Sequence, residues 1–162
     1  MFSQALRARA EKLLAAARAK GFKIATAESC TGGLIAGLLT EIPGSSDVVE
    51  RGFVTYSDKA KEEMLGVPSA LIRQHGAVSE QVARVMAEGA IRNSTAQLSV
   101  AVTGIAGPGG GSDEKPVGLV HIAAARAGEA TLHRECRFGE IGRAEVRLKS
   151  IETALEMLSG LL

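Results

Sequence analysis

The sequence predicts an α/β fold, a three-layer α/β/α sandwich with a mixed, mainly parallel central sheet. In the first half of the chain, amphipathic segments with helical spacing alternate with short apolar runs, which is typical of parallel βα units. In the second half, two neighbouring strand-like runs turn back at Gly128 and predict an antiparallel hairpin. Residues 1–162 contain no internal repeat and no linker-like stretch, so we expect a single domain.

The first half is predicted to begin with a helix over residues 3–20. Apolar side chains recur there three and four residues apart, and Gly21 ends the pattern. The elements expected next are a strand over residues 22–29, a helix over residues 31–40 and a strand over residues 47–57. Gly52 lies inside that second strand, where a glycine is typical of a bulge or of a close-approach point.

Cap residues and glycines delimit the elements of the second half. They are expected to be a short helix over residues 57–66, a helical turn at Leu71, a helix over 79–92, a strand over 97–103, hairpin arms over 119–126 and 130–138, and a helix over 140–159. The last helix has the clearest periodicity, because its apolar residues lie three and four apart along its whole length. The helices are expected to cover both faces of the sheet.

Composition and charge exclude several classes of protein. The chain is 46% hydrophobic and 23% charged with a net charge of +1, so it offers no field of one sign to a nucleic acid or a membrane surface. No apolar run approaches the about 20 residues that span a bilayer. Cys30 and Cys136 lack the spacing of a disulfide framework or a zinc site. We therefore expect a cytoplasmic protein without nucleic-acid or membrane partners.

The most informative stretch, AESCTGG at residues 27–33, joins the first strand to the second helix. The first turn of a helix leaves backbone N–H groups without internal acceptors, and such donors favour an anion or an oxyanion. Ser29 and Cys30 stand in front of them, which is the layout of a nucleophile on a strand-to-helix turn. The same stretch also fits a plain N-cap at Ser29 or Thr31, with glycines that permit close packing. A packing role as a small apolar side chain suits Cys30 better than a nucleophilic one.

A serine nucleophile needs a base within hydrogen-bond reach. Structural or surface roles suit the three histidines better, and only His75, in a loop, is kept as a reserve. Lys61 follows the strand that ends near Tyr56, and a lysine whose pKa is lowered by burial accepts a proton. Lys59 is two residues away and is expected to point elsewhere, and either lysine also fits a solvent-exposed helix face. The phenol of Tyr56 is expected to relay a proton or hold the lysine, or to be a half-buried strand aromatic.

The strand ends and one glycine-rich loop are expected to complete a pocket. Ser29, Tyr56 and Thr103 each fall at the carboxyl end of an expected strand, where ligands bind in α/β sheets. The loop over residues 104–118 suits phosphate binding through backbone N–H groups, although it lacks the Gly-Lys-Ser/Thr ending of a P-loop. The acidic residues are scattered along the chain, so no metal site is expected.

Several strings resemble the CinA C-terminal domain family, in the same order and from about residue 22 to the end. They are AESCTGG (27–33), PGSS (43–46), YSDKAK (56–61), LGV (65–67), GAVSE (76–80), TGIAGPGGG (103–111) and KPVGLV (115–120). The resemblance implies a nicotinamide mononucleotide deamidase of the pyridine nucleotide cycle, which releases nicotinate mononucleotide and ammonia without a metal or other cofactor. Some members are fused behind a molybdopterin-binding-like domain, and we expect the stand-alone form here. The other function considered is a non-catalytic, competence-associated module that binds nucleotides or partners.

The resemblance and the residues themselves together give a set of expected site residues. The resemblance makes Ser29 the nucleophile, with Lys61 and Tyr56 as its catalytic partners. The expected oxyanion donors are the backbone N–H groups of Cys30, Gly32 and Gly33. The residues expected to bind the substrate are Thr31, Thr103, Gly104, Ala106, Gly107 and Gly109, with Arg143 or Arg147 near the phosphate. Arg51, where relatives often carry glycine, and Asp58, where asparagine is common, depart from the pattern. A homo-oligomer is expected, because small domains with a long loop often complete their site through a dimer.

Overall fold

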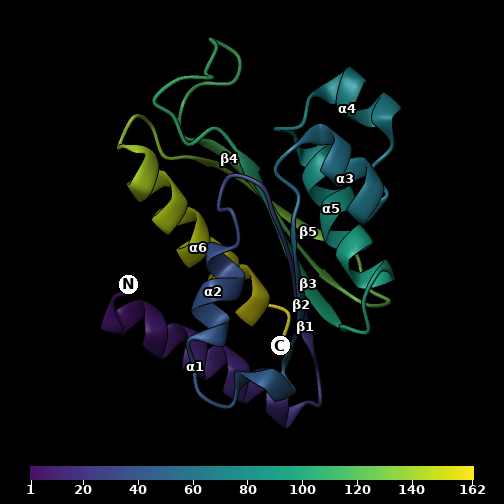
Figure 1. The fold of residues 1–162 in the computed structure, drawn as a ribbon, viewed down its shortest axis with the longest axis vertical. Coiled ribbons are helices and arrows are strands. Elements are labelled where there is room, and N and C mark those ends of the chain that lie inside the picture. The colour runs from purple at the N-terminus through teal and green to yellow at the C-terminus, as the bar shows by residue number, and fades with distance from the viewer.

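Helices and strands alternate along the chain in the computed structural model, which describes residues 1–162. In order they are α1 (Gln4–Ala19), β1 (Ile24–Glu28), α2 (Leu34–Thr40), the 3₁₀ helix η1 (Ser45–Asp47), β2 (Val49–Val54), α3 (Asp58–Leu65), α4 (Ser69–His75), α5 (Glu80–Arg92), β3 (Leu98–Gly104), β4 (Leu119–Arg126), β5 (Leu132–Arg137) and α6 (Arg143–Ser159). The sheet lies between α1, α2 and α6 on one face and α3, α4 and α5 on the other, which confirms the three predicted layers (Figure 1).

The strand order is β2-β1-β3-β4-β5. β1 pairs in parallel with both β2 and β3, whereas β4 is antiparallel to β3 and to β5. Only β4 therefore runs against the others, and the predicted mixed, mainly parallel sheet is confirmed. The carboxyl ends of β1, β2 and β3 meet at one edge, which is where such sheets bind ligands.

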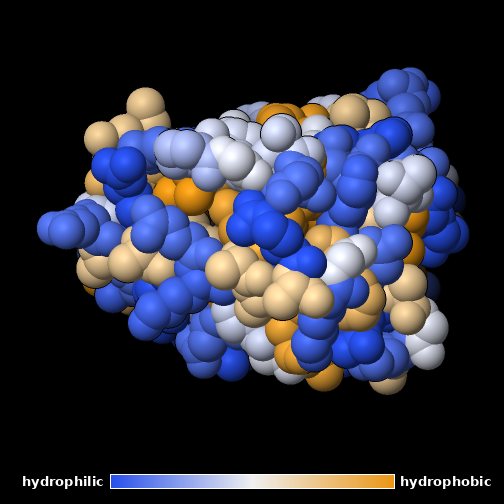
Figure 2. All heavy atoms as spheres, turned by 90° about the horizontal axis from the view of Figure 1, so that it is seen from below, coloured by the Kyte–Doolittle hydropathy of each residue, from blue (hydrophilic) through white to orange (hydrophobic).

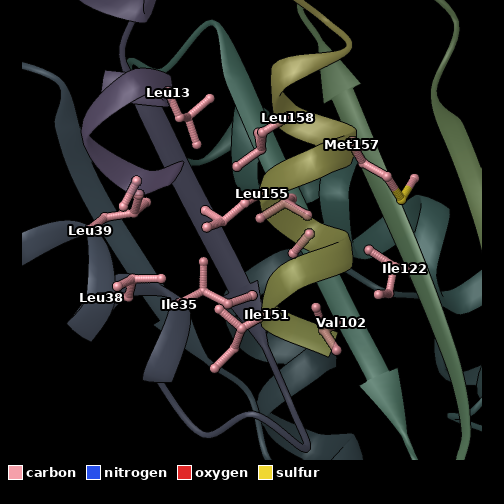
Figure 3. Close-up of a cluster of buried hydrophobic side chains, with 14 of the residues drawn as sticks. Leu13, Ile35, Leu38, Leu39, Val102, Ile122, Ile151, Leu155, Met157 and Leu158 are labelled. Atoms are coloured by element: carbon pink, nitrogen blue, oxygen red, sulfur yellow. The ribbon is translucent and has the colours of Figure 1, made fainter. Parts of the chain in front are cut away.

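The two faces of the sheet carry side chains of different size. Toward α1, α2 and α6 the central strands present Ile24, Val100, Val102, Val120 and Ile122. Figure 3 shows leucines of α1 and α2 gathered with Leu155 and Leu158 of α6 on this side. Toward α5 the same strands present Ala25, Ala27, Ala101, Ala123 and Ala125. The small alanines allow α5 to lie close to the sheet.

Close packing continues from α5 to α3, the helix that carries Lys61. Gly89 of α5 faces the end of α3, and a Cβ at that position would collide with the carbonyl oxygen of Leu65. The absence of a side chain at Gly89 therefore lets α3 sit directly on α5 and beside the carboxyl end of β2.

The β-bulge predicted at Gly52 lies two residues earlier, at Glu50. Ile24 pairs with Val49 but Ala25 pairs with Arg51, so Glu50 is the extra residue of β2. Gly52 is the predicted close approach instead, since a Cβ there would lie 2.9 Å from Thr26 Oγ1. The Arg51 side chain is exposed and donates to the Glu50 carboxylate and to the Asn93 carbonyl, so the strand accommodates it.

On the face shown in Figure 2, hydrophilic and hydrophobic residues are interspersed. None of the helices combines the length and the hydropathy that crossing a bilayer requires. Cys30 and Cys136 are both buried and free.

A histidine pair joins β4 to β5 beside the start of α5. The Nδ1 atom of His121 lies 2.9 Å from Nε2 of His133, and the two rings stack with centroids 5.1 Å apart. The charged groups around the pair are Glu80, Arg84, Lys115 and Glu135. Burial lowers the pKa of both imidazoles from the ordinary value, so the folded protein disfavours their charged forms.

The pair is expected to make stability depend on pH. Because the folded-state pKa values lie below those of the unfolded chain, the unfolded state binds more protons, and the free energy of unfolding should decrease as pH falls below about 6.5. Urea denaturation between pH 7.5 and pH 5 measures this slope. The double variant His121→Gln/His133→Gln should have a shallower slope than the wild type, and His75→Gln is the matched control. Equal slopes in the double variant and the wild type would contradict the prediction.

Candidate active site at the carboxyl ends of β1, β2 and β3

The candidate active site is a pocket of about 270 Å³ at the sheet edge formed by the carboxyl ends of the parallel strands. It brings together Ser29, Tyr56 and Thr103, the three residues that the sequence predicts at strand ends. The lining residues are Ser29, Cys30, Tyr56, Asp58, Lys61, Ala77, Val78, Thr103, Gly104, Ala106 and Arg143. None of the three histidines lines it, so the reserve base His75 lies outside the pocket.

Lys61 reaches into the pocket from the middle of α3. The helix begins after Ser57, whose hydroxyl accepts from the Ala60 N–H and fixes the first turn. The Lys61 side chain is 1% exposed. Its Nζ lies 3.1 Å from Ser29 Oγ and donates to the Thr55 carbonyl at 2.9 Å. Lys59, by contrast, lies on the surface and pairs with Glu63.

Burial is the main influence on the pKa of Lys61. Removal from water lowers the pKa of the amine from its ordinary value, and the nearby Asp58 carboxylate opposes this shift only in part. The amine forms no ion pair, since its hydrogen bonds go to the Ser29 hydroxyl and a backbone carbonyl. A neutral amine within hydrogen-bond distance of a hydroxyl is able to take its proton.

Tyr56 contacts Arg143, whereas the sequence suggested a contact with Lys61. Its side chain is 63% exposed, and its hydroxyl accepts from Nη2 of Arg143 at 3.0 Å. The other nitrogen of that guanidinium, Nη1, donates to the Gly107 carbonyl at 2.9 Å. The expectation that the phenol holds Lys61 is therefore not met, because Tyr56 lies beyond the end of β2 and reaches α6.

The backbone N–H groups of the nucleophile turn differ in their availability. The Gly33 N–H donates to Glu28 Oε2 at 3.1 Å and the Gly32 N–H donates to the Ser29 carbonyl at 3.0 Å. The prediction that these two N–H groups stay free for an oxyanion is wrong. The N–H groups of Cys30 and Thr31 donate to no other residue, but only Cys30 lines the pocket, so its N–H is the free donor of this turn that faces the site.

Glu28 explains why the glycines are engaged. Its buried carboxylate also accepts from the Ile35 N–H at 3.0 Å and from the Ala36 N–H at 2.9 Å, so it caps α2 from the neighbouring strand. Neither Ser29 nor Thr31 forms the cap that the sequence also suggested. The Thr31 hydroxyl is buried without a partner.

Replacing Glu28 is expected to destabilise the fold strongly. In Glu28→Gln one acceptor oxygen becomes an NH₂ group that faces backbone donors, and hydrogen bonds to charged groups are each worth about 1.5–3 kcal/mol. We expect the free energy of unfolding in urea to fall by about 3 kcal/mol. Glu41→Gln, at the other end of the same helix, is the matched control and should change it by less than about 0.5 kcal/mol. Similar small changes in both variants would contradict the capping role.

Cys30 is a core side chain rather than a thiolate. It packs in the apolar cluster on the α1, α2 and α6 face. Burial raises the pKa of its thiol to about 11, so the thiol stays protonated near neutral pH despite the nearby helix N-terminus. Ser29, beside the amine, is the better placed nucleophile.

The predicted substrate-binding residues divide into two groups. Thr103, Gly104 and Ala106 line the pocket, and Thr103 Oγ1 donates to the Ala77 carbonyl at 2.9 Å. The others do not line it: Thr31 is buried, Gly107 contributes its carbonyl to Arg143, and Gly109 borders a separate hollow on the outer loop. The loop between β3 and β4, which carries Gly109, projects away from the sheet (Figure 1).

Sequence reasoning missed three lining residues, Asp58, Ala77 and Val78. Ala77 and Val78 belong to the GAVSE string, and Asp58 to YSDKAK, so the signal was present in the motifs without a role attached. No cluster of three or more His, Cys, Asp or Glu side chains is arranged to hold a metal ion.

The chain is similar in sequence to several known proteins. Residues 6–162 match the CinA C-terminal domain. The sequence is 50% identical to the nicotinamide-nucleotide amidohydrolase PncC of Escherichia coli over 149 residues, which cover 91% of this chain and 89% of that protein. It is 62% identical over 108 residues to a CinA-like protein of Akkermansia muciniphila, but the match covers 66% of this chain and only 26% of that longer relative.

Solved structures of similar chains have the same fold. The competence/damage inducible protein CihA of Agrobacterium tumefaciens is 55% identical, with a TM-score of 0.98 over 99% of this chain and 98% of that one. A CinA superfamily protein of Escherichia coli is 33% identical, with a TM-score of 0.92 over 100% of this chain and 94% of that one.

Proposed function

The chain belongs to the CinA C-terminal domain family, and we propose that it is an amidohydrolase that converts nicotinamide mononucleotide to nicotinate mononucleotide and ammonia. The observation that carries the proposal is the 3.1 Å contact between the buried Lys61 amine and the Ser29 hydroxyl. The name of the Escherichia coli relative supports the substrate class. Residues 1–162 act as one domain in this proposal.

In the first step, neutral Lys61 takes the proton of the Ser29 hydroxyl as the oxygen attacks the carboxamide carbon. The carbonyl oxygen becomes an oxyanion, and the free N–H group of Cys30 donates to it. Protonated Lys61 then gives its proton to the amide nitrogen, the C–N bond breaks and ammonia leaves. An ester between the nicotinoyl group and Ser29 remains.

In the second step, water attacks this ester. Neutral Lys61 takes a proton from the water, and the resulting tetrahedral intermediate collapses to release nicotinate mononucleotide and the Ser29 hydroxyl. The same donor serves the second oxyanion. One buried amine therefore acts as base and then as acid in both halves of the reaction.

The charges of the pocket suit a pyridine nucleotide. The Asp58 carboxylate lines the wall beside Lys61 and complements the positive pyridinium ring. The Arg143 guanidinium lines the same pocket and is held by Gly107 and Tyr56, so its charge is available to a phosphate at the mouth. Tyr56 then acts by holding Arg143 rather than by contacting the amine.

The test is ammonia release by the purified protein. Nicotinamide mononucleotide, nicotinamide riboside, nicotinamide and NAD are compared as substrates, and chromatography identifies the product. Stoichiometric ammonia and nicotinate mononucleotide from the mononucleotide, lost in Ser29→Ala, are expected. Binding of the mononucleotide without ammonia release would overturn the proposal and would instead support a non-catalytic nucleotide-binding module.

A further inference from the structure

The hydrogen-bond ladder between β1 and β3 stops beside the nucleophile. The Ser29 N–H donates to the Val102 carbonyl at 3.0 Å, which is the last backbone bond that joins the two strands. In a regular parallel pair, the Ser29 carbonyl would accept the next bond, from the N–H of Gly104. This carbonyl accepts instead from the Gly32 N–H at 3.0 Å, as the chain turns toward α2. The Gly104 N–H is therefore left without the acceptor that the ladder would supply.

The next carbonyls of the turn are engaged by the last helix. Arg147 of α6 donates from Nε to the Cys30 carbonyl at 3.1 Å and from Nη2 to the Thr31 carbonyl at 3.2 Å. Neither carbonyl accepts from Gly104. The Arg147 fork is thus occupied by backbone, and its side chain does not line the pocket, unlike that of Arg143.

Sheet pairing fixes the direction of the Gly104 N–H. Along a strand, the N–H and C=O of one residue point to the same side, and those of the next residue point to the opposite side. The Val102 carbonyl faces β1, whereas the Ile105 N–H donates to the Leu119 carbonyl of β4 at 2.9 Å. Gly104 shares the orientation of Val102, so its N–H points past the end of β1. Adjacent strands lie about 4.8 Å apart, which places this donor close to a group attached to Ser29.

The pocket gives a ligand access to the Gly104 N–H. Gly104 is half-buried and lines the same cavity as Ser29 and Cys30. A Cβ at this position would lie 2.7 Å from Val120 Cγ2 and 2.9 Å from the Leu119 carbonyl oxygen. Glycine therefore keeps β4 paired here and leaves the N–H uncovered on the pocket side.

We propose that the Gly104 N–H is the second oxyanion donor of the site, together with the N–H of Cys30. This inference rests on the proposed amidohydrolase function. Where a nucleophile lies on a strand-to-helix turn, the N–H of the following residue commonly acts with a second N–H from a neighbouring loop, and Cys30 is the residue that follows Ser29. The oxyanion then takes the place that the next carbonyl of the β1–β3 ladder would occupy. β1 supplies the nucleophile and β3 supplies the donor.

The test removes the N–H without adding a side chain. Glycolic acid, incorporated at position 104 by nonsense suppression, converts the amide between Thr103 and Gly104 to an ester that has neither an N–H nor a Cβ. Loss of one oxyanion donor typically lowers kcat by about a hundredfold or more, and we expect this loss with nicotinamide mononucleotide. KM should change by less than about threefold, because the donor acts mainly on the transition state.

Glycolic acid at Gly128 is the matched control. The Gly128 N–H also donates to no other residue, but it lies in the turn between β4 and β5, outside the pocket lining. This ester variant should keep the wild-type kcat. Urea denaturation identifies a variant that is merely unfolded.

Nuclear magnetic resonance of the unmodified protein tests the same donor where the ester at position 104 prevents folding. An N-methylpyridinium boronic acid forms a tetrahedral adduct when Ser29 Oγ bonds to boron and gives its proton to Lys61, and a boronate oxygen then stands for the oxyanion. The amide protons of Cys30 and Gly104 should move downfield in the adduct, and neither should move in Ser29→Ala. The amide proton of Gly128 should not move.

Several results would overturn the assignment of Gly104. They are a wild-type kcat in the folded ester variant, a rise in KM alone, or a downfield shift at Ala106, another unpaired N–H of the lining, in place of Gly104. Ammonia release by the wild type would still uphold the proposed function in each of these cases. A wild-type protein that releases no ammonia would overturn both.

Discussion

Ser29→Ala is expected to lower ammonia release from nicotinamide mononucleotide by at least about a thousandfold, because no other hydroxyl lies in hydrogen-bond contact with the buried amine. The fold should survive, since the substitution removes one small polar group at the pocket surface. Binding of the mononucleotide, measured by calorimetry, should persist within about threefold, because the hydroxyl acts on the carbonyl carbon rather than in ground-state recognition.

Ser69→Ala is the matched control for this variant, since Ser69 is exposed on α4, away from the pocket lining. It should keep full activity. If Ser29→Ala releases ammonia at a rate near that of the wild type, the nucleophile is another group and the acyl-enzyme scheme fails.

Lys61→Met is expected to abolish activity to a similar extent while making the protein more stable. Methionine occupies the same buried position without a charge that must be taken out of water, so the free energy of unfolding should increase. Lys61→Arg should be inactive at every pH, because a guanidinium does not deprotonate in a protein. Ammonia assays and urea denaturation measure the two effects.

The pH dependence of the wild type gives an independent test of Lys61. Burial places the folded-state pKa below the ordinary 10.5, so kcat/KM should rise with pH as the amine loses its proton, with a midpoint below that value. Between the folded and unfolded pKa values the unfolded chain binds more protons, so the stability cost of Lys61 is largest at low pH and shrinks as pH rises. The difference in free energy of unfolding between Lys61→Met and the wild type should therefore also shrink as pH rises.

Lys59→Met is the matched control, because Lys59 is on the same helix but on its solvent face, paired with Glu63. It should change neither the activity nor its pH profile. Full activity in Lys61→Met, or a kcat/KM that falls as pH rises through the alkaline range, would remove the amine from the mechanism.

Local periodicity was enough to predict the fold. The spacing of apolar residues in α1, α5 and α6 and the apolar runs of β1 and β3 are properties of neighbouring residues, so one sequence reveals them. The meeting of strand ends at the pocket follows from parallel pairing alone. For the same reason Ser29 and Thr103 were placed in one pocket without coordinates.

The details of the turn were not predictable, because they depend on contacts distant in sequence or on side-chain direction. Whether Gly33 offers a free N–H depends on how the Glu28 carboxylate folds back onto α2. Which cation Tyr56 meets depends on the start of α6, and no spacing rule links Tyr56 to Arg143. Arg147 reaches the turn from a helix that begins more than a hundred residues later, which the periodicity of α6 does not reveal.

The last residue of β1 and the residue that follows it point to opposite faces of the sheet. Glu28 turns toward α2 and secures it, whereas Ser29 turns toward α3 and meets the amine. Inserting or deleting one residue in β1 would exchange their directions, leaving a carboxylate in the pocket and a hydroxyl under the helix. The register of β1 within the sheet therefore decides which of the two side chains enters the pocket.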